Sequence, residues 1–70
     1  MPHIALSMLP GRSREVKQRL AERLRDTLIE TLGVDEKFVS VSVEDVEMKD
    51  WNHSMERFAE ENIFVNPNKK

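Results

Sequence analysis

Residues 2–13 read PHIALSMLPGRS, and residues 14–32 continue as REVKQRLAERLRDTLIETL. In the first stretch, hydrophobic side chains alternate with small or polar ones, which predicts a β-strand over residues 2–9. The alternating hydrophobic positions are Ile4, Leu6 and Met8. Both faces of this strand are fairly apolar, as in a strand that is covered on both sides. Pro10-Gly11 then predicts a turn.

The second stretch predicts a long helix over residues 14–32, because hydrophobic residues recur every four positions. These residues are Val16, Leu20, Leu24, Leu28 and Leu32, with Ala21 widening the stripe. Ser13 is expected to cap the first turn, and Gly33 is expected to end the helix. At 1.5 Å per residue, the helix would be about 28 Å long.

A second strand is predicted over residues 38–46. One face would carry Val39, Val41 and Val43, and the other would carry Ser40, Ser42 and Glu44. A strand, a long helix and a strand form a β-α-β unit, whose strands are parallel with a right-handed crossover. The predicted fold class is therefore α+β, within one domain of residues 1–70 that has its core in residues 1–48.

The tail, residues 49–70, has a less regular pattern. Met55, Phe58 and Ala59 fit one face of a short helix, with Asn52 or Ser54 as its cap. Residues 63–65 are hydrophobic and could add a few residues of strand, and residues 68–70 are expected to be frayed.

The predicted unit is too small to stand alone, because two strands and one helix leave one sheet face uncovered. The chain has no cysteine, so neither a disulfide nor a cysteine zinc site can support it. The sequence therefore predicts subunit association, which would complete the sheet.

Composition excludes several classes of function. Lys and Arg number 11 against 13 Asp and Glu, and a net charge of −2 argues against nucleic-acid binding. No apolar run approaches the roughly 20 residues that span a membrane, and the N-terminus lacks the charged region of a signal peptide. No metal-ligand spacing is found. We expect a cytoplasmic protein without a metal or cofactor.

The most informative chemical feature is Met1-Pro2. Removal of the initiator Met would leave Pro2 with a free secondary amine, and an α-amino group titrates near pH 7.7–8.0. Such an amine could act as a general base at neutral pH. The competing interpretation is that Met-Pro is an ordinary beginning of a chain.

Other candidate residues each have a structural alternative. Arg12 lies in the turn before the helix, where it could bind a carboxylate or remain a solvated arginine. Trp51 could form the apolar wall of a pocket or simply anchor the tail. His3 should point away from Pro2 and is interpreted as structural, and His53 has no evident partner.

Taken as a whole, the chain resembles the 4-oxalocrotonate tautomerase family. The resemblance lies in the order of Met-Pro, a strand, Leu9-Pro10-Gly11-Arg12-Ser13, a five-turn helix, a valine-rich strand and an aromatic residue. The resemblance runs from Pro2 to about Trp51. It implies a β-α-β fold assembled into dimers or hexamers, and a hexamer is favoured because the chain is close to hexamer-forming length. It also implies catalysis by Pro2 without a cofactor, carboxylate binding by Arg12 and an apolar wall from Trp51.

One departure from this family lies at Ser40, where the best-known member has a second arginine that contacts the substrate. Ser40 aligns with a substrate-binding position but cannot supply that charge, which disfavours 2-hydroxymuconate as the substrate. The helical tail is similar to that of dimeric relatives that act on phenylpyruvate. The resemblance implies an enol or keto acid substrate. The alternatives are a non-catalytic oligomeric binding protein on the same scaffold and a related decarboxylase or dehalogenase.

Overall fold

The computed structural model describes residues 1–67 of the 70-residue chain. The regular elements follow the order β1 (His3–Met8), α1 (Arg14–Leu32), β2 (Ser40–Asp45) and α2 (Trp51–Met55). Single 3₁₀ turns occur at η1 (Glu36–Phe38), η2 (Met48–Asp50) and η3 (Glu60–Asn62). The predicted order of strand, helix and strand is confirmed, and α1 has the predicted bounds.

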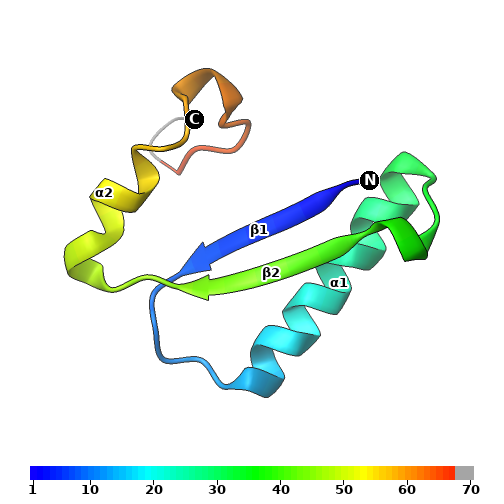
Figure 1. Cartoon of the computed structure of the whole chain (residues 1–70), viewed down its shortest axis with the longest axis horizontal. Coiled ribbons are helices and arrows are strands. Elements are labelled where there is room, and N and C mark those ends of the chain that lie inside the picture. Colours follow the sequence, from blue (N-terminus) through cyan, green and yellow to red (C-terminus); the bar gives the residue numbers. More distant parts are fainter. Residues whose placement is uncertain (68–70) are drawn as a thin grey trace.

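The two strands form a parallel sheet in which His3 pairs with Ser40 and Met8 pairs with Asp45 (Figure 1). The side chains of Val41 and Val43 line a hollow together with residues of α1, so they lie on the helix-covered face. The opposite face, here called the outer face, carries the alternating positions His3, Ala5, Ser40, Ser42 and Glu44, all of which are exposed.

Local capping explains where α1 begins and ends. The Ser13 side chain accepts a hydrogen bond from the Val16 N–H at 3.2 Å, which satisfies a donor that the first turn leaves free. Gly33 adopts the left-handed conformation at φ 70°, and its N–H donates to the Ile29 carbonyl at 2.8 Å. Both predicted helix ends are therefore confirmed.

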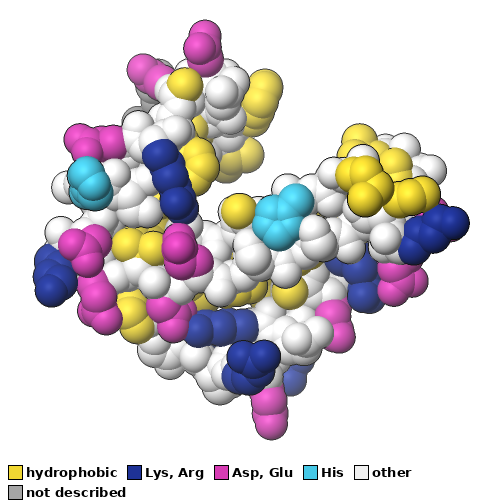
Figure 2. All heavy atoms as spheres, in the orientation of Figure 1, with side chains coloured by type: hydrophobic (Ala, Val, Ile, Leu, Met, Phe, Trp, Pro, Cys, Tyr) yellow, Lys and Arg dark blue, Asp and Glu magenta, His cyan; other side chains and the backbone are white. Residues whose placement is uncertain are grey.

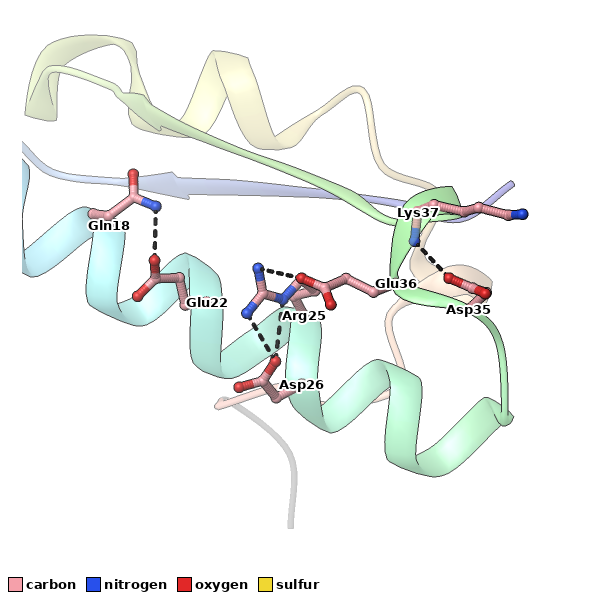
Figure 3. A network of polar contacts seen from close by, with 7 residues as sticks. All are labelled: Gln18, Glu22, Arg25, Asp26, Asp35, Glu36 and Lys37. Carbon is pink, nitrogen blue, oxygen red and sulfur yellow. Dashed lines mark hydrogen bonds and ion pairs between the residues drawn. The ribbon is translucent and has the colours of Figure 1, made fainter.

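The connection from α1 to β2 is fixed by polar contacts (Figure 3). Arg25 on the helix lies 3.3 Å from the Glu36 carboxylate, and Asp35 accepts a hydrogen bond from the Lys37 N–H at 3.0 Å. This turn includes Phe38, so the second strand begins at Ser40 and not at the predicted residue 38.

The tail differs from the sequence prediction. Helix α2 begins at Trp51, before both predicted caps, and no side chain caps it. It ends at Met55, so Phe58 lies outside the helix, and residues 63–65 are not a strand. Phe58, Phe64 and Val65 remain exposed, so they lack the packing that would extend the helix or add a strand. Residues 68–70, predicted to be frayed, lie outside the described residues.

Very little of the isolated chain is buried. Among residues 1–67 only Val46, at 8% exposure, is classed as buried, whereas Phe64 is 93% exposed. Hydrophobic side chains also gather on the surface at the end where the N-terminus and η1 lie (Figure 2). The radius of gyration is 13.6 Å, against about 11 Å for a 70-residue globular domain. The open sheet and thin core fit the predicted completion by oligomerisation.

Candidate active site

Pro2 lies directly before β1, where its side chain is half-buried. Its carbonyl accepts a hydrogen bond from the Ser40 N–H at 3.3 Å, which holds the start of β2 beside it. The parallel register explains this contact, since the residue that precedes His3 must meet the residue paired with His3. Two of the predicted site residues, Pro2 and Ser40, are therefore neighbours.

His3 is bonded to two serines of the neighbouring strand. Its Nδ1 lies 2.7 Å from the Ser40 Oγ, and its Nε2 lies 3.0 Å from the Ser42 Oγ. His3 lies on the outer face, as the alternation predicted, but the sequence prediction gave it no partner. This contact could be found only from the strand register, because the register brings Ser40 and Ser42 next to His3.

The loop from β1 to α1, which contains Arg12, and the start of α2 at Trp51 lie at the opposite end of the sheet from the N-terminus (Figure 1). Arg12 is exposed in the turn that follows β1, and Trp51 is half-buried at the start of α2, after β2 has ended. The six residues of β1 separate Pro2 from this end, a span of about 20 Å at 3.3 Å per residue. One chain alone does not bring Pro2 and Arg12 into contact.

The family model for tautomerase enzymes matches residues 2–66 of the chain. The chain belongs to the tautomerase family. It is 53% identical over 51 residues to a probable tautomerase of Xylella fastidiosa, a match that covers 73% of this chain and 62% of the relative. A probable tautomerase of Bacillus cereus is 37% identical over 66% of this chain and 75% of its own length.

A third relative, from Bacillus subtilis, bears the name 2-hydroxymuconate tautomerase and is 35% identical over 66% of this chain and 74% of its own length. These matches confirm the predicted family and its enzyme class, isomerases of the tautomerase type. They do not address which residues act or on which substrate, so both remain proposals.

Two ion pairs of this tautomerase chain lie near the end of the sheet that carries Arg12. Lys17 pairs with Asp45 at 2.7 Å, which joins α1 to the end of β2. Arg57 lies 3.2 Å from the Glu44 carboxylate and 3.3 Å from the Ser7 Oγ, which ties the tail to the outer face. These contacts link α1 and the tail to the strand ends that lie next to the Arg12 loop.

His53, for which the sequence suggested no partner, pairs with Glu56 at 3.3 Å. This i,i+3 contact follows from their positions at the end of α2 and is highly exposed. It gives His53 a local role in the tail. Within residues 1–67, no cluster of three His, Cys, Asp or Glu side chains is arranged to hold a metal, and no helix has the length and hydrophobicity to cross a membrane.

Proposed function

We propose that the protein is a cofactor-independent tautomerase that converts the enol form of a 2-hydroxy-2-enoate or an arylenolpyruvate to its keto form. The observation that carries this proposal is the position of Pro2 in a tautomerase-family chain. Pro2 stands at the open start of β1, and its carbonyl is held by Ser40. Removal of Met1 would turn the Pro2 nitrogen from an amide into a basic amine at that position.

The proposed reaction needs one base that also serves as an acid. Neutral Pro2 takes the proton from the enol hydroxyl, and the resulting ammonium returns a proton to carbon 3, which leaves the keto acid. Proton transfer by a positioned group of this kind contributes roughly 10²–10⁴-fold to the rate. Positioning of the substrate supplies a further part of the acceleration.

Positioning requires a second subunit. Arg12 is the proposed carboxylate-binding residue, yet it lies about 20 Å along β1 from the Pro2 of its own chain. A neighbouring chain that runs antiparallel would place its Arg12 end beside this Pro2. The half-exposed Trp51 would come with it and form an apolar wall. We therefore propose a homo-oligomer, a hexamer or a dimer, whose sites are shared between chains.

The substrate class rests on the charge that each group offers. A single guanidinium matches one carboxylate, and Ser40 adds a hydroxyl in place of a second cation. This favours a monocarboxylate such as phenylenolpyruvate over a dicarboxylate. The name of the Bacillus subtilis relative, 2-hydroxymuconate tautomerase, supports the reaction type more directly than the choice of acid.

An assay of ketonisation tests the proposal, with phenylenolpyruvate and 2-hydroxymuconate as substrates. Protein without Met1, verified by intact mass, should catalyse the reaction, and phenylenolpyruvate should be preferred. Matched protein that retains Met1 has the same chain but an amide nitrogen at Pro2, and it should be nearly inactive. Equal rates for the two forms would refute Pro2 as the base. Inactivity of both forms on both acids would favour a non-catalytic binding protein.

A further inference from the structure

The loop that carries Arg12 is anchored at both of its ends. It lies between β1 and α1. Its first end is held by the sheet, where the Val46 N–H donates to the Met8 carbonyl at 2.8 Å. Its second end is held by the helix, where the Lys17 N–H donates to the Ser13 carbonyl at 3.1 Å. The position of Arg12 therefore depends on how the end of β1 and the start of α1 are placed relative to each other.

One residue of β2 contacts both of these ends. Asp45 is the register partner of Met8 in the parallel sheet, and its side chain forms an ion pair with Lys17 at 2.7 Å. Lys17 lies in the first turn of α1, directly after the loop. The ion pair therefore ties the start of the helix to the residue that already holds the end of β1. A cross-link of this kind limits the freedom of the segment that it closes.

Packing contributes little to the position of this loop. Arg12 and both of its neighbours, Gly11 and Ser13, are exposed. Gly11 at φ 130° occupies a backbone region that residues with a side chain rarely adopt, and a Cβ added there would meet no atom within 4 Å. The loop is thus surrounded by open space at this point. The polar contacts at its two ends are the ones that can fix Arg12.

A second ion pair of α1 offers a comparison. Arg25 lies 3.3 Å from Glu36, and the two side chains are 32% and 67% exposed. Lys17 and Asp45 are 22% and 40% exposed, so water and salt screen their shorter contact less. At 1.5 Å per residue, Arg25 is about 12 Å along α1 from Lys17. Both pairs hold the helix to the segment that follows it, but only the Lys17 pair borders the loop that carries Arg12.

We propose that Lys17 and Asp45 are positioning residues that hold Arg12 in place for the substrate carboxylate. This inference rests on the proposed function, in which Arg12 binds that carboxylate. The pair acts through the loop and does not touch the substrate. A guanidinium that is already in place loses less freedom on binding than one that must first be ordered. The pair should therefore strengthen substrate binding, and it should do so only while Arg12 is present.

Kinetics of processed protein with phenylenolpyruvate test this role. Lys17→Met keeps an unbranched side chain but removes the charge, and it should raise KM about threefold or more while kcat stays within about twofold. Asp45→Asn breaks the same pair from the strand side and should raise KM by a similar factor. Lys17→Arg keeps a cation at this position and should retain most of the wild-type binding. Unchanged KM in both Lys17→Met and Asp45→Asn would overturn the inference.

The matched control is Arg25→Met, which removes the other ion pair of α1 and leaves the Arg12 loop with its anchors. Its KM should stay within about twofold of wild type, because a surface change away from the loop does not reach Arg12. Urea denaturation of both variants shows how much stability each has lost. An equal rise of KM in Arg25→Met and Lys17→Met would overturn the inference, because the effect would then come from a general loosening of the helix.

A double-mutant cycle separates positioning of Arg12 from any other effect of the ion pair. In a chain that already carries Arg12→Ala, Lys17→Met should change kcat/KM by less than about 1.5-fold, because no guanidinium is left to position. An effect as large without Arg12 as with it would overturn the inference. Inactive wild-type protein, or an Arg12→Ala variant with unchanged kcat/KM, would instead be the failure of the proposed function, and the inference would fall with it.

Discussion

At the scale of single residues, the two main residues of the proposed site lie at opposite ends of β1. Pro2 is the proposed base before the start of β1, and Arg12, the proposed anchor for the carboxylate, follows its end. Both residue types were predicted from the sequence because each occurs in a short local motif. Their separation within one chain could not be predicted from the motifs, since it depends on the extended length of the strand.

Replacement of Arg12 by Ala should weaken binding more than it slows chemistry. A hydrogen-bonded ion pair to a charged group contributes about 1.5–3 kcal/mol, so KM for phenylenolpyruvate should rise roughly ten- to a hundredfold. Arg23→Ala removes the same charge from an exposed position on α1 and serves as the control. If Arg12→Ala left kcat/KM unchanged, Arg12 would have no role in binding or in the transition state.

The pH dependence of processed protein should report the Pro2 amine. Only the neutral amine accepts a proton, so kcat/KM should fall as the pH drops below its pKa. A guanidinium beside the amine disfavours the ammonium, which puts this pKa below the reference range of about 7.7–8.0. Arg12→Ala should move the acidic limb to higher pH. A limb that does not move would show that Arg12 and Pro2 are not neighbours in the assembly.

The contacts of His3 show where residue-level prediction ends. The alternation of polar and apolar residues placed His3 on the outer face without reference to any other segment. Its partners, Ser40 and Ser42, are more than 35 residues away in the chain, and only the pairing of β1 with β2 brings them together. A histidine of this kind becomes a candidate only after the register is known.

At the scale of elements, the helix was predicted best because its ends are decided by local capping. Ser13 and Gly33 each satisfy backbone groups within their own turn, so no distant contact is needed. The tail was predicted least well, since α2 is only five residues long and has no side-chain cap. Phe64 and Val65 are 93% and 88% exposed, so hydrophobic packing against the rest of residues 1–67 does little to hold that segment.

The left-handed cap at Gly33 allows a stability test of the element. A Cβ added at this position would meet no atom within 4 Å, so Gly33→Ala changes the backbone energy and introduces no clash. We expect the free energy of unfolding to fall by about 1–2 kcal/mol, the cost of a left-handed conformation for alanine. Gly33→Asn should lose less. Urea denaturation at a fixed protein concentration measures both, and unchanged stability for Gly33→Ala would contradict a left-handed cap.

At the scale of the whole molecule, the exposed area argues for association. The accessible surface is 6177 Å², whereas a compact monomer of 8.2 kDa exposes only about 4,500 Å². The difference, roughly 1,700 Å², exceeds the about 800 Å² that each partner buries in a typical stable interface. The single chain is therefore more open than an independent domain of this size.

We expect light scattering to give at least twice the 8.2 kDa chain mass, with the hexamer favoured over the dimer. Association would cover the outer face and the exposed hydrophobic residues at the chain ends, and it supplies the free energy that the thin core lacks. The measurement should be repeated over a range of concentrations. A monomer that remains folded on dilution would contradict both the oligomer and the shared site.

The shared site itself can be tested by mixing two impaired chains and assaying them at a substrate concentration far below the KM of the Arg12→Ala chain. One chain retains Met1, so its Pro2 is blocked but its Arg12 is intact; the other carries a free Pro2 and Arg12→Ala. In a mixed dimer, the free Pro2 of one chain faces the intact Arg12 of the other, and the second site has neither. In an equal mixture, random association makes half of the dimers mixed, and each mixed dimer has one complete site of its two. The mixture should therefore recover about a quarter of wild-type activity. If Pro2 and Arg12 acted within one chain, no mixture would contain a complete site, and the mixed protein would be no more active than its two components.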